Sequence, residues 1–344
     1  MIKNLLVTGN LGYIGTILTK YLEEKKYNVV GYDNGYYENN IFGKDLSGLA
    51  VQIKKDIRDI ESEDLSNIDC VIHLAGLSND PLGEFNKSLT FDINLKATIE
   101  IAKLSKMKGV KRFIYISSQS MYGVSNSANE LDEDLSEKNP ITTYAKAKWE
   151  AEKEINNLSD SKFTVVSFRP STVFGWSPRL RCDIVFNNLV ASAYTEKKII
   201  VFSDGSPWRP VIHIRDVCAA IFAGLIAPSE IINKKSYNIG IKNGNYTVKE
   251  MAEVVKKLYP QTEVIFKNQT PDARTYKVSF NRILTELSKY YKPAWNLQDG
   301  AKELIENFDK YNFTKKDFYG AKTNRIQQLK YLQDNGLLTD EFRI

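Results

Sequence analysis

The chain has 344 residues, 42% of them hydrophobic, so it can bury a large core and suits a nucleotide-binding domain with a smaller companion. Its 47 basic and 42 acidic residues are interspersed, and the formal net charge of +5 does not imply nucleic-acid binding. No window approaches the roughly 18 uninterrupted apolar residues of a membrane span, and the chain starts like a strand rather than a secretion signal. We therefore expect a cytoplasmic protein without membrane insertion.

Cysteine and histidine are scarce in this sequence. The three cysteines, Cys70, Cys182 and Cys218, are widely separated and form no CxxC pair, which is typical of buried free thiols in a reducing compartment. With two histidines besides, the sequence offers no ligand cluster, and we expect no metal. His73 ends an apolar run, where we expect a structural role rather than acid–base chemistry.

The first 170 residues or so alternate short apolar runs with longer stretches of helical period, the pattern of a parallel sheet flanked by helices. The expected strands are residues 4–8, 28–32, 50–54, 70–74, 112–116 and 164–168. The expected helices between them are residues 14–24, 89–106 and 143–156. The predicted fold class is therefore α/β, a Rossmann-type doubly wound parallel sheet with a smaller, interleaved C-terminal substrate-binding domain.

The second half of the chain has a different texture. Its expected elements are a helix at 184–194, a strand at 199–202, a turn at 203–207, a strand at 211–214, a helix at 217–225 and a strand at 236–239. The last strand could return to the main sheet, so no clean linker is expected. The predicted domains are a Rossmann domain at 1–175 with returns near 211–240, a substrate-binding domain at 176–210 and 241–314, and a C-terminal helical tail at 315–344 that packs against the body or a partner subunit.

A glycine-rich turn, TGNLGYIG at residues 8–15, joins the first strand to the first helix. Gly9 permits the tight bend, Gly12 lets the backbone approach a pyrophosphate, and Gly15 lets the helix pack closely on the strand. Backbone N–H groups at the helix start then face the anion. The turn predicts a dinucleotide-binding site.

Asp33 ends the second expected strand, where its carboxylate can accept hydrogen bonds from an adenosine ribose. A carboxylate there would repel a 2′-phosphate, and no lysine or arginine follows before Lys44, so NAD is favoured over NADP. Asp56 and Ile57 follow the third strand and can meet the adenine ring, although a surface-loop acid is an equally good interpretation of Asp56.

Tyr144 and Lys148 lie four residues apart on one face of an expected helix. A neighbouring cation stabilises a phenolate, so the pair predicts a lowered pKa for Tyr144 and a usable base. Ser118 follows the fifth strand and can hydrogen-bond a substrate hydroxyl while Tyr144 removes its proton and the hydride leaves to a nicotinamide. Lys148 would also hold the nicotinamide ribose.

In combination these motifs resemble the extended short-chain dehydrogenase/reductase family, specifically the NAD-dependent epimerases and dehydratases that act on nucleotide sugars. The resemblance covers nearly the whole chain and rests on TGNLGYIG at 8–15, HLAG at 73–76, SSQSMYG at 117–123 and YAKAK at 144–148. It implies that Ser118, Tyr144 and Lys148 are catalytic, that NAD is the cofactor, that the substrate is a nucleotide-diphosphate sugar, and that the enzyme is a homodimer or higher homo-oligomer.

The resemblance also implies the rest of the cofactor site. Besides Gly9, Gly12, Gly15, Asp33, Asp56, Ile57, Tyr144 and Lys148, it comprises Tyr13, Ile14, Asn34, Leu74, Ala75, Gly76, Asn94 and Pro170. Asn94 matches the family's active-site asparagine. In the loop expected under the nicotinamide, residues 169–175, Ser171 and Thr172 replace the usual Phe and Asn.

The substrate site is implied in the same way. Its expected members are Ser78, Ser118, Ser120, Thr172, Arg179, Asn187, Asn188, Leu189, Arg209 and Arg274. Arg209 occupies the place of a diphosphate-binding arginine, whose planar fork meets such a group bidentately. Arg179 and Arg181 could contact the substrate, but solvated surface arginines are an equally good interpretation.

The residues after Ser118 bear on the reaction. Related 4,6-dehydratases carry an Asp-Glu pair there, whereas this chain has Gln119 and Ser120, so dehydration is disfavoured. The sequence predicts oxidation of the C4 hydroxyl of a nucleotide-activated sugar, by a 4-dehydrogenase or a 4-epimerase, in the biosynthesis of sugars for capsule or lipopolysaccharide. Alternatives are a reductase or decarboxylase of the same family and, from another class, a nucleotide-sensing scaffold without catalysis.

Overall fold

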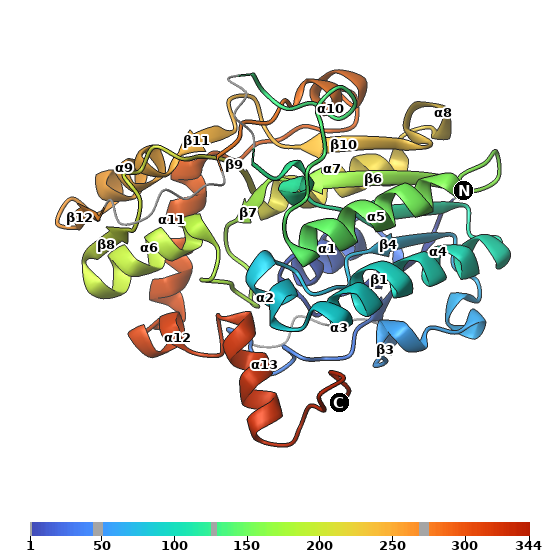
Figure 1. Ribbon diagram of the computed structural model, residues 1–344, viewed down its shortest axis with the longest axis horizontal. Coiled ribbons are helices and arrows are strands. Elements are labelled where there is room, and N and C mark those ends of the chain that lie inside the picture. Colours follow the sequence, from blue (N-terminus) through green and yellow to red (C-terminus); the bar gives the residue numbers. More distant parts are fainter. Residues whose placement is uncertain (1, 44–50, 125–128, 268–274) are drawn as a thin grey trace.

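The computed structural model describes residues 2–43, 51–124, 129–267 and 275–344 (Figure 1). Within these ranges the main sheet has seven parallel strands in the order β10-β6-β5-β4-β1-β2-β3. The strands are β1 (Asn4–Thr8), β2 (Asn28–Tyr32), β3 (Val51–Ile53), β4 (Cys70–His73), β5 (Arg112–Ile116), β6 (Thr164–Pro170) and β10 (Lys235–Ile239). The chain changes direction across the sheet between β1 and β4, and such a switch point opens a crevice at the carboxyl ends of the strands. The predicted Rossmann-type α/β fold is confirmed.

Helices cover both faces of this sheet (Figure 1). α1 (Tyr13–Glu24) and α7 (Ile214–Ile226) pack together on one face, and α4 (Ala97–Met107) and α5 (Thr143–Asn157) pack together on the other. Successive residues of β1 serve the two cores, since Leu5 and Val7 join the first and Leu6 the second. Strands buried on both faces read as continuous apolar runs, which is why the sequence pattern located them. None of the helices in the described ranges is long and apolar enough to cross a membrane.

The helix expected at residues 89–106 is interrupted. The structure has α2 (Asp80–Phe85), α3 (Lys87–Phe91), a π-helical turn η3 (Asp92–Lys96) and then α4. Asn79 and Asn86 cap α2 and α3 by accepting hydrogen bonds from the N–H groups of Leu82 and Leu89. Single π-helical turns are frequent at functional sites, and this one carries Asn94.

The second half builds a smaller body beside the sheet. Its strands form a sheet of β7 (Thr172–Phe174), β9 (Trp208–His213) and β11 (Asn245–Thr247) and a pair of β8 (Lys198–Val201) and β12 (Glu263–Phe266). Around a third apolar core pack α6 (Val185–Glu196), α9 (Val248–Leu258) and α11 (Leu297–Lys310). The return to the main sheet is made by α7 and β10, whereas β9, expected at 211–214, pairs with β7 and β11. The short elements are η1 (Ile57–Asp59), η2 (Ser62–Leu65), η4 (Gln119–Tyr122), α8 (Ser229–Ile232) and α10 (Asn281–Glu286).

The C-terminal tail contains α12 (Lys315–Tyr319) and α13 (Arg325–Asp334), which lies beside α2 (Figure 1). The Gln328 side chain donates a 3.0 Å hydrogen bond to the carbonyl of Tyr36, and the Tyr36 hydroxyl donates to the carbonyl of Phe342. Arg58 also donates to this segment, at 2.8 Å to the carbonyl of Glu341. The tail therefore packs against the body of the same chain, close to the end of β2.

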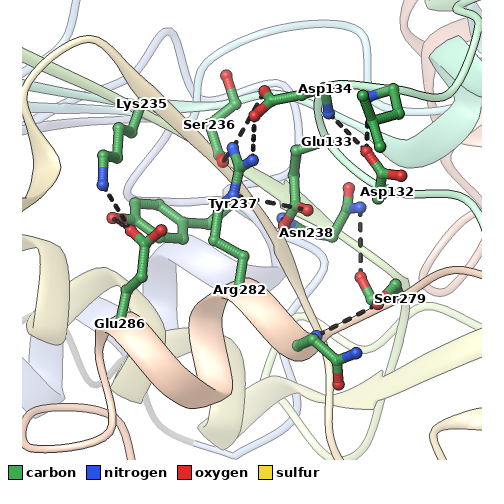
Figure 2. A network of polar contacts seen from close by, with 12 residues as sticks. Asp132, Glu133, Asp134, Lys235, Ser236, Tyr237, Asn238, Ser279, Arg282 and Glu286 are labelled. Carbon is green, nitrogen blue, oxygen red and sulfur yellow. Dashed lines mark hydrogen bonds and ion pairs between the residues drawn. The ribbon is translucent and has the colours of Figure 1, made fainter.

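A polar network joins the loop after η4 to the edge of the sheet (Figure 2). Arg282 of α10 forms an ion pair with Asp134, while the Glu133 carboxylate accepts a 2.8 Å hydrogen bond from the N–H of Asn238 in β10. The Asn238 side chain in turn accepts a 2.9 Å hydrogen bond from the hydroxyl of Tyr122. Since Tyr122 ends η4, the network holds the segment that follows Ser118 from behind.

Candidate functional site

A cavity of about 860 Å³ lies at the carboxyl ends of β1, β2, β4 and β5 and extends to α6 and β9. Of the residues that the sequence assigns to the site, those lining it are Gly9, Gly12, Tyr13, Ile14, Gly15, Asp33, Asn34, Asp56, Ile57, Leu74, Ala75, Gly76, Ser78, Ser118, Ser120, Tyr144, Lys148, Pro170, Thr172, Asn188, Leu189 and Arg209. Asn94, Arg179 and Asn187 are not part of this lining, and Arg274 lies outside the described residues. The fold therefore brings most of the predicted site into one cavity.

The glycine-rich turn has no room for a Cβ at Gly9 or at Gly15. Gly9 has a φ of +73°, and a Cβ on it would lie 2.8 Å from the backbone nitrogen of Ala75. A Cβ on Gly15 would collide with the carbonyl oxygen of Gly9. Gly12 caps α1 without a side chain, so the first N–H groups of that helix have no side-chain acceptor at this position. The turn is built to admit an anion at the start of α1.

Asp33 lies at the end of β2 with its carboxylate fixed by the backbone. Its two oxygens accept hydrogen bonds from the N–H groups of Gly35 at 2.8 Å and Leu11 at 3.1 Å. Burial raises the pKa of Asp33, and these two hydrogen bonds oppose the rise. The carboxylate is thus oriented at the adenosine end of the cavity, as a ribose-binding acid requires.

Asp56 is less available than its place in the lining suggests. Its carboxylate pairs with Arg58 at 2.7 Å and also caps η1 through the Arg58 N–H at 2.9 Å. Although burial acts to raise its pKa, the hydrogen bonds and charge of Arg58 lower it. The side chain is neither an open ligand nor a solvated surface acid, because it anchors Arg58, which in turn binds the C-terminal tail.

Ser118 and Tyr144 meet over the cavity. Ser118 caps η4, where its Oγ accepts a 3.1 Å hydrogen bond from the N–H of Ser120 and donates to the Ser120 Oγ at 3.0 Å. Burial raises the pKa of Tyr144 to about 12, and a hydrogen bond with Ser118 opposes this rise. Both side chains line the cavity, so a substrate hydroxyl bound there can meet the Ser118 hydroxyl and the Tyr144 phenol together.

The lowered pKa predicted for Tyr144 is wrong for the protein groups alone. Lys148 is buried, donates a 2.8 Å hydrogen bond to the carbonyl of Ile116 and lies 4.8 Å from the centre of the Tyr115 ring. Burial lowers the pKa of Lys148 to about 7. Burial thus disfavours both the Lys148 ammonium and the Tyr144 phenolate, and a further positive charge in the cavity would favour the phenolate.

Asn94 and His73 support the cavity from behind. The Asn94 amide accepts from the Leu77 N–H at 2.8 Å and donates to the Leu77 carbonyl at 2.9 Å, which fixes the loop after β4. Asn94 is fully buried, so in this structure it positions the loop rather than facing the cofactor cavity. His73 is hydrogen-bonded on both sides, to Thr8 at 2.8 Å and Thr98 at 2.9 Å, and burial lowers its pKa to about 3. It is a neutral structural histidine.

The opposite wall carries the residues expected to hold the substrate. Asn188 lines the cavity and donates a 3.0 Å hydrogen bond to the carbonyl of Cys182. Arg209 reaches the wall from β9 and donates to the carbonyl of Trp208 at 2.8 Å. Asn187 instead is fully buried, where it accepts from the Gly175 N–H and donates to the Tyr13 hydroxyl. It joins the two halves of the molecule and does not reach the cavity.

Arg179 and Arg181 are not surface residues. Arg179 is 1% exposed and donates to the hydroxyl of Thr16 in α1 at 3.2 Å, away from the cavity lining. Arg181 lines the cavity, forms an ion pair with Asp183 at 2.8 Å and donates to the Ser78 hydroxyl at 3.0 Å. The surface interpretation of this pair is therefore wrong, and of the two only Arg181 contributes to the wall.

The cavity-lining residues absent from the predicted site include Tyr37, Asp183 and Arg325. Tyr37 comes four residues after Asp33 and belongs to none of the sequence motifs. Arg325 comes from the C-terminal tail, far from every recognisable motif. Arg325 reaches the cavity only because the C-terminal tail folds back onto the body, and no local sequence pattern predicts that packing.

Gln119 and Ser120 follow Ser118 at the cavity wall. Gln119 is 1% exposed and donates through its side-chain amide to the carbonyl of Arg169 at 3.0 Å. Ser120 presents a hydroxyl that is already hydrogen-bonded to Ser118. At these two positions the structure has neither a carboxylate nor an ammonium, and neither side chain is a general acid of ordinary strength.

The chain matches the model of the NAD dependent epimerase/dehydratase family over residues 5–240. It belongs to that family. The match contains the glycine-rich turn, Asp33, and the group of Ser118, Tyr144 and Lys148.

The relatives are named for different reactions. The chain is 25% identical over 89% of its length, and 96% of the relative's, to the UDP-glucuronate 4-epimerase of Thermodesulfobacterium geofontis. It is 29% identical to the dTDP-D-glucose 4,6-dehydratase of Dictyostelium discoideum, over 70% of this chain and 58% of that protein. A solved structure of the UDP-glucuronic acid 4-epimerase from Bacillus cereus, in complex with UDP-glucuronic acid and NAD, matches with a TM-score of 0.75 and 25% identity over 89% of this chain and 99% of that one. The chain is thus an enzyme of an NAD-dependent nucleotide-sugar epimerase, dehydratase and decarboxylase family.

NAD, the cofactor of the family, fits the residues present. At Gly9 and Gly15 a Cβ would collide with neighbouring backbone, so the turn stays tight and brings the start of α1 to the cavity wall. Asp33 is oriented at one end for a ribose, and Ser118 and Tyr144 lie at the other. When bound, NAD supplies the hydride acceptor. The described ranges contain no group of three or more histidine, cysteine or acidic residues placed to hold a metal ion.

Proposed function

We propose that this protein oxidises the C4 hydroxyl of a nucleotide-diphosphate sugar to a 4-keto sugar, with NAD as hydride acceptor. The observation that carries the proposal is the meeting of Ser118, Tyr144 and Lys148 in the lining of one cavity. Ser118 holds the substrate oxygen, Tyr144 takes the hydroxyl proton, and the C–H bond of the same carbon releases its hydride. These roles need no acid or base beyond the group itself.

The electrostatics of the site explain why the oxidised cofactor is needed for base activation. Burial is the main cause that raises the pKa of Tyr144 to about 12, so the phenol stays protonated at neutral pH. The positive nicotinamide of NAD would favour the phenolate, and so would the Lys148 ammonium in the fraction of molecules that retain its proton. We also assign to Lys148, which lines the cavity, the role of holding the nicotinamide ribose.

For the substrate we propose a nucleoside diphosphate held by Arg209, Asn188 and the start of α6. Arg209 is the cation of β9 in the cavity wall, and its guanidinium suits a diphosphate. Ser78, Ser120, Thr172 and Leu189 line the space between this wall and the reacting hydroxyls, and we assign them to the sugar and nucleotide.

The fate of the keto sugar defines two versions of the proposal. If the hydride returns to the other face, the enzyme is a 4-epimerase, and if the keto sugar leaves, it is a 4-dehydrogenase. The similarity to 4-epimerases over almost the full length of both chains supports the first version. We further propose a role in surface-polysaccharide sugar biosynthesis, a cytoplasmic location and a homodimer or higher homo-oligomer.

Dehydration, reduction and decarboxylation are the competing reactions. Gln119 and Ser120 supply no carboxylate for elimination, which counts against a 4,6-dehydratase despite the similarity to one. Asp33 counts against a reductase that would use NADPH. A decarboxylase needs a cation that binds the carboxylate of a uronate. Arg181 is a cation in the cavity wall, although it is paired with Asp183, so decarboxylation remains the second candidate.

The test is to incubate the enzyme with UDP-, GDP-, dTDP- and CDP-sugars in deuterated water, with and without a 2-oxoacid as electron acceptor. A 4-epimerase gives a C4 epimer of unchanged mass without the acceptor, and a 4-dehydrogenase gives a keto sugar only when NADH is reoxidised. Products would be identified by mass spectrometry and NMR. Loss of water from the sugar, or of carbon dioxide from a uronate, would contradict the proposal.

A further inference from the structure

Arg325, the first residue of α13, reaches the cofactor cavity from the C-terminal tail. It is 2% exposed and is part of the cavity lining. Its Nη2 donates a 2.9 Å hydrogen bond to the carbonyl of Arg179, and its guanidinium lies 4.2 Å from the centre of the Tyr37 ring. The side chain is therefore held in place by a carbonyl and an aromatic face.

This guanidinium has no carboxylate partner in the described part of the chain. Arg181, its neighbour in the wall, is matched by Asp183 through two hydrogen bonds, whereas Arg325 forms no ion pair there. Burial lowers the pKa of Arg325 to about 10, and the charge of Arg181 adds to this effect. The charge of Asp183 opposes this fall, but both oxygens of that carboxylate accept hydrogen bonds from Arg181. A buried cation whose nearby carboxylate is already hydrogen-bonded to another arginine is expected to gain from an incoming anion.

Two hydrogen-bond donors at this place are also unused. The Nη1 of Arg325 and the hydroxyl of Tyr37 are both buried, and neither has a hydrogen-bond partner among the described residues. Tyr37 lines the same cavity. Unsatisfied buried donors are uncommon in folded proteins and call for an explanation. A ligand with several acceptor oxygens would satisfy both.

The position of Arg325 and Tyr37 in the cavity indicates which anion they could bind. Tyr37, whose ring lies under the Arg325 guanidinium, comes four residues after Asp33, and Gln328 of the same helix donates a hydrogen bond to the carbonyl of Tyr36. Although burial raises the pKa of Asp33, the charge of Arg325 also acts to lower it. Arg325 therefore lies against the loop that follows Asp33, the residue expected to bind the adenosine ribose.

We propose that Arg325 and Tyr37 bind the diphosphate of NAD, on the side opposite to the N–H groups of α1. A dinucleotide with its adenosine ribose at Asp33 and its nicotinamide at Tyr144 must carry its diphosphate between these points. The inference rests on that orientation, which belongs to the proposed function. Arg209, on the far wall, remains the candidate for the diphosphate of the sugar nucleotide.

The consequence is a cofactor site that the C-terminal tail completes. The family match ends at residue 240, and α13 begins 85 residues later. The hydrogen bonds between Gln328 and Tyr36 and between Arg58 and Glu341 hold the tail against the loops after β2 and β3. The tail is thus a binding element as well as a packing element.

The experiment measures binding to the full chain, freed of nucleotide, for the wild type, Arg325→Met and Tyr37→Phe. The probes are NADH, ADP-ribose, adenosine and UDP. We expect Arg325→Met to bind NADH and ADP-ribose about 10-fold more weakly or worse, because a hydrogen bond to a charged group is lost. Tyr37→Phe keeps the ring and should weaken both by about 3- to 10-fold. Affinities for adenosine and UDP should stay unchanged in both variants.

Thermal unfolding separates binding from a merely structural role. Without ligand, Arg325→Met should unfold at the wild-type temperature or above, because an uncompensated buried charge is removed. Saturating ADP-ribose should raise its unfolding temperature less than that of the wild type. Lys330→Ala, which removes an exposed cation from the same helix, is the matched control and should behave as the wild type.

Several results would overturn the inference. One is an unchanged affinity of Arg325→Met for ADP-ribose, and another is an equal loss of adenosine affinity together with a lower unfolding temperature. A selective loss of UDP affinity would assign the pair to the substrate's diphosphate instead. If wild-type protein bound no NADH at all, the proposed function itself would fail, which these outcomes for the variants do not imply.

Discussion

The ammonium of Lys148 donates a 2.8 Å hydrogen bond to the carbonyl oxygen of Ile116, the last residue of β5. The bond fastens α5 to the strand that leads into Ser118. It also draws the ammonium into the interior, where burial lowers the pKa of Lys148 from its ordinary value of 10.5 to about 7. The geometry that aligns the catalytic group therefore weakens the charge that would activate it.

This shift predicts a pH dependence of stability. The pKa of Lys148 is lower in the folded state, so the unfolded state binds more protons between pH 7 and 10.5, and stability should rise with pH across that window. Lys148→Met removes the group and should flatten this part of the profile. Urea unfolding of both proteins at pH 7, 8 and 9, without nucleotide, measures the difference. Parallel profiles would show that the folded-state pKa of Lys148 is not lowered.

Tyr144→Phe should reduce kcat by about 100- to 10,000-fold, the range typical of general-base catalysis, while NAD still binds. The ring remains in place, and only the hydroxyl that contacts Ser118 is lost. Turnover and NADH binding would be measured on the same preparation. Tyr331→Phe, which alters an exposed tyrosine of α13, is the control and should keep full activity. Retained activity in Tyr144→Phe would remove Tyr144 as the base.

The parts of the site that the sequence predicted are those held by local backbone geometry. The glycine-rich turn, Asp33 at the end of β2, and Ser118 after β5 each follow a buried strand, so their positions at the sheet edge come from the strand pattern itself. Tyr144 and Lys148 share a helix face because of their spacing. For these residues the chain of inference from sequence to cavity needs no long-range contact.

The parts that the sequence missed or misjudged depend on burial and on distant segments. Arg325 reaches the cavity because the tail folds back, and Arg179 is buried because the loop after β7 packs on α1. The pKa of Tyr144 depends on how strongly burial opposes the phenolate, which spacing alone does not reveal. Asn94 matches a motif, yet its amide is used by the backbone of Leu77.

Arg209→Ala should weaken the binding of the nucleotide-sugar substrate by about 10-fold or more, through the loss of a charge-assisted contact to the diphosphate. NADH affinity should not change, because Arg209 comes from β9 of the smaller sheet, whereas the glycine-rich turn joins β1 of the main sheet to α1. Titration with UDP and NADH separates the two effects. Lys242→Ala removes an exposed cation outside the cavity lining and serves as the control. Equal UDP affinity in Arg209→Ala and the control would reject the assignment.

A buried ion pair between β6 and α5 should contribute strongly to the free energy of unfolding. Arg169 of β6 and Glu152 of α5 are 3% and 1% exposed at their side chains, and their closest atoms are 2.6 Å apart. Removing one partner leaves the other as an unpaired buried charge. Arg169→Met should therefore lower the free energy of unfolding by about 3 to 5 kcal/mol. The double variant with Glu152→Leu should recover part of that loss. Denaturant titrations of the four proteins measure the coupling, and additive effects would contradict it.

Asp33 should set the preference for NAD over NADP. Its carboxylate is held by the N–H groups of Leu11 and Gly35, so it cannot swing away from a 2′-phosphate. Asp33→Ser should weaken NADH binding and strengthen NADPH binding, because a repulsive charge is removed while the arginines near Asp33 remain. Asp56→Asn is the matched control, since that carboxylate is occupied by Arg58, and its ratio of the two affinities should stay near the wild type. A wild-type protein that prefers NADPH would refute the role of Asp33, and an unchanged ratio in Asp33→Ser would place the discrimination elsewhere in the loop after β2.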